Sequence, residues 1–472
     1  MATQSSDLTG TLVVGSTGQG VEFRATPVRL TRYGVVFELY GLASPLQASE
    51  ALRNFKIILN DQVIYSGRAV VKSLLETGPA CLCEATLEDS WIDAGLFANG
   101  NGHGGIKEHY DRFLAGWQKS YKIQPEYKVV AADMQTFLTD LRLWIEQVEI
   151  GVRSSPGGDR AQMEREAGEA LARAAFPAID TMFEKYELLA SKIEEELQPV
   201  HRAYIKRQVH PLVLCSPFAY RTVAKPLGYA GDYEVVNMLL RDPHEGPSLF
   251  GKVLNRWFIK QPPAEAHRNR IKYLTQKLYE ETARLAARGK TARIFNLGCG
   301  PAQEIQDFVT RYDVSDHARF TLLDFNEETI RFATMILSDL KNRHHRGVSL
   351  DFVKKSVGQV LKGRGRKAEG GAQYDFVYCA GLFDYLSDAI CEQLLSIFYD
   401  MLAPGGLLVA TNVDVYNPIR HWLGDILEWH LIYRNGDQFR ALAPAAASPD
   451  DVKVVADATG VNVFLEVRKP CP

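Results

Sequence analysis

The sequence predicts an α/β protein in three parts: a small N-terminal β-barrel-like domain, a helical middle segment and a C-terminal doubly wound sheet. Short apolar or alternating runs separated by turn residues fill residues 11–95, which is typical of a small barrel or sandwich. Apolar residues then recur at three- and four-residue steps between residues 130 and 197, which predicts long helices with one buried face. From residue 290 onward, apolar strands alternate with helical patterns, as in a parallel sheet covered on both faces.

We expect a β-rich domain at residues 1–97, a helical middle segment at 104–285 and an α/β domain at 286–472. The chain has 472 residues, enough for roughly three domains of about 150 residues each. The Asn- and Gly-rich stretch Asn99–Gly105 is typical of a linker. The β-rich part is therefore expected to fold as a separate module that does not supply the chemistry.

Short runs of sequence predict the individual elements. Asn60-Asp61 between two β-rich runs indicates a hairpin, and Ser154–Gly158 separates the two helical stripes. The expected N-terminal strands are 11–14, 21–24, 35–39, 55–59, 63–65, 69–71 and 80–85. The expected strands of the α/β domain are 293–297, 320–324, 348–352, 374–378 and 406–410, with 461–467 as a closing edge strand.

Composition excludes several classes of protein. The net charge is −3, with 57 acidic and 54 basic residues, so no overall basic field favours nucleic acid. No apolar run has the roughly 18–20 residues that span a bilayer, and Met1–Thr9 is polar, unlike a secretory signal. The seven cysteines lack zinc spacing. These features predict a reduced, cytoplasmic protein without a disulfide framework, a metal site or integral membrane contact.

The candidate site follows the first strand of the α/β domain. In the stretch Asn296–Ala302, Gly298 and Gly300 let the chain turn sharply into a helix and let a ligand approach the backbone. The helix N-terminus offers free N–H groups to a polar or negatively charged ligand end. Asp324 ends the next strand, where a carboxylate can accept both hydroxyls of a ribose. A packing turn without a ligand is the alternative interpretation.

A dinucleotide is not the expected ligand of this turn. The dinucleotide fingerprint G-x-G-x-x-G requires glycine at position 303, where this sequence has Gln303. A single nucleoside with a short zwitterionic tail fits the turn better.

Residues 290–412 resemble the core of class I S-adenosylmethionine-dependent methyltransferases. The resemblance rests on the glycine turn Asn296–Ala302, on Asp324, on Tyr374–Leu382 and on the Pro404–Gly406 turn. It implies a Rossmann-like sheet and S-adenosylmethionine as cofactor. Asn296 stands where the family usually has an acidic residue, and Ser356 with backbone groups replaces the usual adenine-binding acid. The cofactor-binding residues that the resemblance implies are Asn296, Gly298, Gly300, Ala302, Asp324, Phe325, Asn326, Ser356, Val357, Ala380 and Gly381.

Two narrower resemblances cover the rest of the chain. Ser216–Phe218 and Lys225–Glu234 resemble bacterial 3-hydroxy fatty acid methyl ester synthases, a group associated with 3-hydroxypalmitic acid methyl ester, which implies carboxyl O-methylation. The N-terminus resembles PilZ-type domains, which bind cyclic dinucleotides through RxxxR and D/NxSxxG motifs. Arg24 and Arg29 are five residues apart rather than four, and Leu30–Gly34 lacks the second motif. The resemblance therefore favours a homodimerisation or scaffolding role over nucleotide sensing.

Tyr229–Glu234 combines turn glycines with hydrogen-bonding side chains. In the functional interpretation it is a lid that closes over the methionine end of the cofactor and excludes water, with Tyr229 and Asp232 as contacts. In the structural interpretation Asp232 caps a helix. The two interpretations are compatible.

The acceptor pocket is expected beyond the carboxyl ends of the strands. Arg420 and Arg434 are candidates to clamp a substrate carboxylate, with solvated helix arginines as the alternative. A phenol or ammonium acceptor would need a base, and His421, Tyr385 and Tyr229 are the candidate catalytic residues; a structural histidine is the commoner case for His421. The expected substrate-binding residues are Asn412, Tyr416, Arg420, Trp429, Tyr433 and Arg434.

The leading hypothesis is S-adenosylmethionine-dependent O-methylation of the carboxylate of a lipophilic hydroxy acid. The second is O- or N-methylation of a polar natural-product intermediate. The third, from another class, is a cyclic-dinucleotide-responsive binding protein with a vestigial methyltransferase fold. The degenerate arginine spacing and the intact Gly298, Gly300 and Asp324 set argue against the third.

Overall fold

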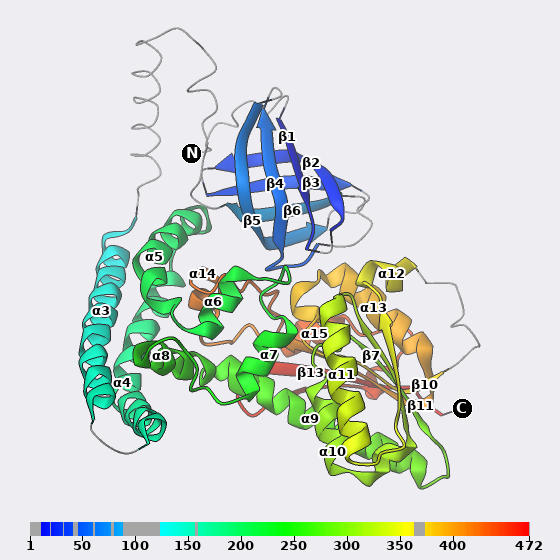
Figure 1. Ribbon diagram of the computed structural model, residues 1–472. Coiled ribbons are helices and arrows are strands. Elements are labelled where there is room, and N and C mark those ends of the chain that lie inside the picture. Colours follow the sequence, from blue (N-terminus) through cyan, green and yellow to red (C-terminus); the bar gives the residue numbers. More distant parts are fainter. Residues whose placement is uncertain are drawn as a thin grey trace.

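The computed structural model describes residues 11–18, 20–31, 33–40, 46–59, 62–76, 80–87, 123–155, 159–362 and 373–471. Figure 1 shows three parts: a barrel, a layer of helices, and a mixed sheet with helices on its faces. The predicted linker Asn99–Gly105 and the Asn60-Asp61 turn lie outside the described residues.

The N-terminal part is a closed antiparallel barrel with strand order β1-β2-β3-β6-β5-β4, as the alternation of apolar residues predicts. Phe37, Phe55 and Tyr65 fill its centre, with ring centroids 5.9 and 6.2 Å apart. The runs 63–65 and 69–71 form one strand, because Gly67 pairs with Phe55 across the ladder instead of turning. The strands are β1 (Thr11–Ser16), β2 (Glu22–Thr31), β3 (Gly34–Tyr40), β4 (Ala51–Leu59), β5 (Gln62–Glu76) and β6 (Ala80–Leu87).

The two helical stripes form two long helices that pack against each other, as predicted. Asp159 caps the second of them by accepting hydrogen bonds from the N–H groups of Ala161 and Gln162. Shorter helices continue the layer toward the sheet (Figure 1). The helices are α3 (Pro125–Ser154), α4 (Arg160–Ala190), η1 (Glu195–Leu197), α5 (Gln198–Val213), α6 (Pro217–Ala224), α7 (Tyr233–Leu240), α8 (Leu249–Ile259) and α9 (Pro262–Ala286).

The C-terminal sheet has the order β12-β13-β11-β10-β7-β8-β9. The five adjacent strands from β11 to β9 are parallel, as predicted. The run 461–467 is not an edge strand, because β12 pairs with its outer side and β11 with its inner side, both antiparallel. The sequence analysis missed β12. The strands are β7 (Ala292–Leu297), β8 (Ala318–Asp324), β9 (Ser349–Lys354), β10 (Tyr374–Cys379), β11 (Leu402–Val413), β12 (Val452–Ala456) and β13 (Asn462–Arg468).

Helices cover both faces of this sheet and connect its strands (Figure 1). The expected Pro404–Gly406 turn lies inside β11, where the pairing with β10 shifts register and Gly405 has φ of 75°. The helices are α10 (Gln303–Arg311), η2 (Asp313–His317), α11 (Glu327–Arg343), α12 (Val357–Lys362), η3 (Phe383–Tyr385), α13 (Asp388–Met401), α14 (Arg420–Asp425), α15 (Gly436–Ala441) and η4 (Pro449–Asp451).

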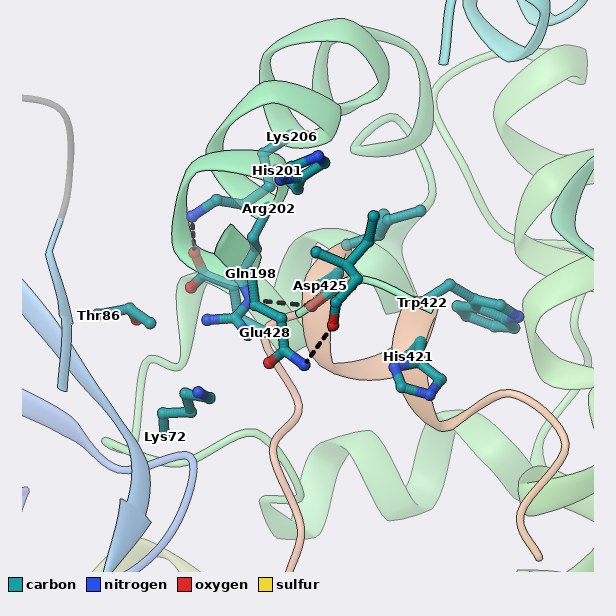
Figure 2. Close-up of polar contacts among 12 residues, drawn as sticks. Lys72, Thr86, Gln198, His201, Arg202, Lys206, His421, Trp422, Asp425 and Glu428 are labelled. Carbon is teal, nitrogen blue, oxygen red and sulfur yellow. Dashed lines mark hydrogen bonds and ion pairs between the residues drawn. The ribbon is translucent and has the colours of Figure 1, made fainter. Parts of the chain in front are cut away.

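The barrel packs directly on the rest of the protein through a buried carboxylate, Glu428, which lies after α14. Arg68 of the barrel reaches this carboxylate at 3.2 Å, Lys206 of α5 at 2.7 Å and Lys225 after α6 at 3.8 Å. Figure 2 shows Lys206 directed at Glu428. Burial alone would raise the pKa of Glu428, but Lys206, Lys225 and Arg68 hold that pKa well below its ordinary value. One anion thus connects three parts of the chain.

Candidate cofactor and acceptor site

The glycine turn after β7 has the backbone that the sequence predicts. Gly298 and Gly300 have φ of 75° and 52°, a region that side chains disfavour. A Cβ on Gly300 would meet no atom within 4 Å, so the turn opens onto free space. Ala302, with φ of 55°, is the N-cap of α10.

Asp324 lies opposite this turn at the end of β8. It is buried, and its two carboxylate oxygens accept hydrogen bonds from Asn326 N–H at 3.0 Å and Gly300 N–H at 3.2 Å. Each oxygen keeps a second lone pair for a ligand hydroxyl. Burial raises the pKa of Asp324 to about 6, against the opposing effect of the backbone hydrogen bonds.

A cavity of about 960 Å³, partly open to solvent, extends from this turn. Three polar atoms on its walls are buried and have no hydrogen-bond partner among the described residues: Asn296 Oδ1, His267 Nε2 and Gln47 Nε2. Such atoms are costly unless a ligand or water satisfies them. The predicted cofactor residues that line the cavity are Asn296, Gly298, Gly300, Ala302, Asp324, Phe325, Val357, Ala380, Gly381 and Tyr229.

Of the described residues predicted to bind cofactor, Asn326, Ser356 and Asp232 do not line this cavity. Asn326 and Ser356 accept hydrogen bonds from the N–H groups of Thr329 and Gln359, at the starts of α11 and α12. Asp232 caps α7 and pairs with Arg221 at 2.9 Å, which confirms its structural interpretation. All three side chains are occupied in holding the loops around the cavity.

The predicted lid stretch covers the cavity. Tyr229, Gly231 and Tyr233 line it, and the Tyr229 ring packs on Phe325 with centroids 5.4 Å apart. A Cβ on Gly231 would come within 2.5 Å of the Tyr385 hydroxyl. This close approach explains why glycine is needed at position 231.

A second cavity of about 790 Å³ adjoins the first and shares Gly231, Val236, His267, Arg270, Gly381 and Tyr385 with it. Most of its other lining side chains are apolar, from α6 to α9 on one side and from the segment after β11 on the other. Asp384 is the one carboxylate among the described residues that line it. Two adjoining cavities, one beside the glycine turn and one beyond it with mostly apolar side chains, suit a cofactor and an apolar acceptor.

Of the six residues predicted to bind substrate, Trp429 alone lines this second cavity among the described residues. Arg434 is buried and donates to Asp388, Asn412 and two backbone carbonyls. The remaining predicted residues do not line it: Tyr416 is 80% exposed, Arg420 is exposed, and Asn412 and Tyr433 lie outside the cavity wall.

The candidate bases also differ from expectation. His421 lies on α14 beside Trp422 (Figure 2), and its backbone N–H donates to the Glu187 carboxylate. Its side chain lines neither cavity, which does not support a role as base. Tyr385 lines both cavities and accepts a hydrogen bond from Trp429 Nε1 at 2.8 Å. Burial raises the pKa of Tyr385, as it does that of Tyr229, so both phenols stay protonated at neutral pH and can donate.

Sequence reasoning missed two polar residues at the junction of the cavities, His267 and Arg270 of α9. Arg270 Nη2 donates to His267 Nδ1 at 2.7 Å. Since Nδ1 accepts this bond, Nε2 carries the proton of a neutral imidazole. Burial, reinforced by Arg270, lowers the pKa of His267 well below its ordinary value, which keeps the ring neutral. The two residues lie one helical turn apart, but no feature of the sequence near them pointed to a ligand.

Residues 294–406 match a protein family described as "Methyltransferase domain". An uncharacterized protein of Rickettsia prowazekii is 21% identical over 133 residues, and the match covers 28% of this chain and 46% of that protein. The chain therefore spans less than half the length of this curated relative.

Solved structures resemble this chain at low sequence identity. A possible exported protein from Bordetella parapertussis is 17% identical, with 64% of this chain and 97% of that chain covered and a TM-score of 0.40. Magnesium protoporphyrin IX methyltransferase from Synechocystis, solved with bound S-adenosylmethionine, is 12% identical over 43% of this chain and 83% of that chain, with a TM-score of 0.29. An N-methyltransferase from Bradyrhizobium japonicum, in complex with S-adenosylhomocysteine, is 16% identical over 50% of this chain and 98% of that chain, with a TM-score of 0.30.

Residues 294–406 thus match a methyltransferase domain, and they include the glycine turn and Asp324. The residues present fit S-adenosylmethionine, the cofactor expected from the sequence: Asp324 has free lone pairs for ribose hydroxyls, Gly300 leaves open space, and Asn296 Oδ1 is a buried acceptor without a partner among the described residues. No helix among the described residues is long and apolar enough to cross a membrane.

Gly231→Ala should lower kcat/KM about tenfold or more, because the added methyl group would displace the Tyr385 hydroxyl and break its bond to Trp429. The measurement is steady-state kinetics beside the thermal midpoint. Gly151→Ala is the matched control, since Gly151 lies in α3 with no atom within 4 Å of an added Cβ. Wild-type kinetics of Gly231→Ala would show that this contact does not shape the site.

Proposed function

We propose that this protein is an S-adenosylmethionine-dependent methyltransferase that esterifies the carboxylate of a lipophilic acid, with a 3-hydroxy fatty acid as the leading substrate class. The observation that carries the proposal is the junction of the two cavities, where three hydrogen-bond donors meet an apolar chamber. The donors are the Arg270 guanidinium, His267 Nε2–H and the Tyr385 hydroxyl.

Arg270 is the group that would recognise the acid. Among the described residues, no carboxylate lies within ion-pair distance of its guanidinium; its partner is the neutral His267. A partly buried cation without an anionic partner is costly. A substrate carboxylate at the cavity junction would supply that partner in a bidentate geometry.

The chemistry of the junction also suits a carboxylate. Bound S-adenosylmethionine supplies an electrophilic methyl group on a sulfonium sulfur. A carboxylate is ionised near pH 7 and needs no base, so this chain's residues have to orient one oxygen and exclude water. The three donors at the junction orient the carboxylate oxygen, and the apolar walls exclude water. Phe218, Phe258 and Trp422 are among the walls that would accommodate the alkyl chain.

Mass spectrometry of 3-hydroxy fatty acids incubated with the protein and methyl-labelled cofactor tests the proposal directly. A labelled methyl ester is the expected product, and chain-length dependence of kcat/KM should follow the size of the apolar cavity. Transfer to an amine or a phenol, with no ester from any acid, would contradict it.

Arg270→Leu should raise the KM for the acid about 10- to 100-fold, since it removes a charged hydrogen-bonding partner. The dissociation constant of S-adenosylhomocysteine, measured by calorimetry, should stay near the wild-type value. If the variant instead loses S-adenosylhomocysteine and keeps its KM, Arg270 binds the cofactor and not the acceptor. Arg319→Leu, at an exposed position on β8, controls for the loss of an arginine.

Asp384 favours one alternative function, methylation of a hydroxyl or amine on a more polar acceptor. It is buried in the acceptor cavity, and burial raises its pKa although Arg270 opposes this, which is the behaviour of a general base. Asp384→Asn separates the two functions: ester formation keeps its pH profile, whereas base-dependent transfer loses its rise with pH.

A further inference from the structure

The barrel reaches the cofactor cavity through one turn, residues 46–50, which precedes β4. Gln47 of this turn lines the cavity, together with residues of the glycine turn and the lid. Its side chain is 4% exposed, and its Nε2 has no hydrogen-bond partner among the described residues. A buried amide donor without a partner is costly, so this atom faces a position where a ligand acceptor fits.

The turn is held rigidly from both sides. Within the barrel, Glu50 accepts hydrogen bonds from Gly18 N–H at 2.7 Å and from Gln47 N–H at 2.9 Å. Toward the methyltransferase domain, Ala48 N–H donates to the Tyr385 carbonyl at 3.1 Å, and Ser49 Oγ donates to the His430 carbonyl at 2.9 Å. Ser49 has φ of 63°, a conformation that persists only where its surroundings fix it.

The residue that follows this turn, Ala51 of β4, contacts the lid. Ala51 N–H donates to the Gly228 carbonyl at 2.7 Å, one residue before Tyr229. A Cβ on Gly228 would lie 3.0 Å from the Gly18 Cα, so two glycines let the barrel and the lid backbone meet. The barrel is therefore hydrogen-bonded to the residue that precedes Tyr229, whose ring packs on Phe325.

We propose that Gln47 is a cofactor-binding residue supplied by the N-terminal barrel, and that the 46–50 turn and the lid close the cavity as one unit. The Gln47 amide donates to a hydrogen-bond acceptor of bound S-adenosylmethionine at the Tyr385 end of the cavity. This inference rests on the proposed cofactor use, and it differs from the expectation that the β-rich module does not contribute to the site.

Calorimetry with S-adenosylhomocysteine on the full chain tests the assignment. Gln47→Glu keeps the shape of the side chain and replaces the donor with an acceptor, and Gln47→Ala removes both. Each should raise the dissociation constant about tenfold or more, the usual worth of a buried hydrogen bond to a ligand. Lys56→Ala, exposed on the same barrel, should bind as wild type.

Two further variants separate the possible failures. Asp324→Ala should lose binding of S-adenosylhomocysteine whether or not Gln47 contacts the cofactor. If the wild type itself does not bind S-adenosylhomocysteine, the proposed function and this inference are both overturned. Glu50→Gln keeps one acceptor oxygen for the two N–H groups, so it should weaken binding through the turn and leave the far-ultraviolet circular dichroism unchanged. If the wild type binds, Asp324→Ala does not, and both Gln47 variants retain the wild-type dissociation constant, the role of Gln47 is refuted.

Discussion

Asp324→Ala should weaken S-adenosylhomocysteine binding by about 2–4 kcal/mol, or roughly 30- to 700-fold, because it removes two hydrogen bonds to a carboxylate. The carboxylate also accepts the Gly300 and Asn326 N–H groups, so its loss leaves the glycine turn without an anchor. Asp324→Asn should have an intermediate effect, since one amide nitrogen would face a backbone donor. Calorimetry measures the dissociation constant of the wild type and of both variants. Asp339→Ala, at an exposed position on α11, is the control.

The pH dependence of binding provides a second measurement on Asp324. Its pKa is raised to about 6 by burial, and the ionised form is the one that accepts both ribose hydroxyls. Affinity should therefore rise as pH increases through 6 and level off above it, with a loss of about tenfold at pH 5. Asp324→Ala should flatten this profile. A wild-type affinity independent of pH between 5 and 7 would contradict the assignment.

Glu428→Ala should destabilise the folded protein by about 3–5 kcal/mol, the usual cost of removing one partner from a buried ion-pair network. It would leave Lys225, which is 3% exposed, without its carboxylate, and would remove a carboxylate contact from Arg68 and from Lys206. The free energy of unfolding from denaturant titration is the measurement. Glu327→Ala, whose ion pair with Lys354 is exposed, should leave stability unchanged.

The pH dependence of stability follows from the same carboxylate. Because the folded pKa of Glu428 lies below its ordinary value of 4.5, its contribution is fully present above pH 4.5 and is lost as the pH falls toward the folded pKa. The difference in unfolding free energy between wild type and Glu428→Ala should therefore shrink on acidification. A difference that stays constant below pH 4.5 would show that packing and not charge accounts for the effect.

The cofactor half of the site could be predicted because its parts are close together in sequence. The glycine turn and Asp324 follow consecutive parallel strands, and the ends of adjacent parallel strands meet at one edge of the sheet. No tertiary information is needed beyond that rule. The family resemblance implies Ser356 and Asn326 as cofactor contacts, and the lid interpretation adds Asp232. At helix starts such side chains more often cap the backbone, as these three do.

The acceptor half could not be predicted in the same way. Its polar groups include His267 and Arg270 of α9, and its apolar walls come from helices that precede the sheet and from the segment after β11, so only the tertiary packing brings them together. The segment after β11 has a dense set of polar side chains, but they tie helices to one another: Asp425 pairs with Arg202 (Figure 2), and Arg434 bonds Asp388. Polarity alone does not distinguish these structural roles from ligand contacts.

The apolar walls supplied by Phe218, Leu239, Phe258 and Ala264 have a consequence for how such a protein diversifies. Part of the acceptor choice is therefore encoded in a stretch of gene that lies before the one encoding the nucleoside-binding turn. These four side chains line the acceptor cavity and not the cofactor cavity, so substitutions at their codons can change the acceptor range without altering that turn. A variant that exchanges only these four side chains should change its acceptor preference and keep the cofactor affinity of its parent.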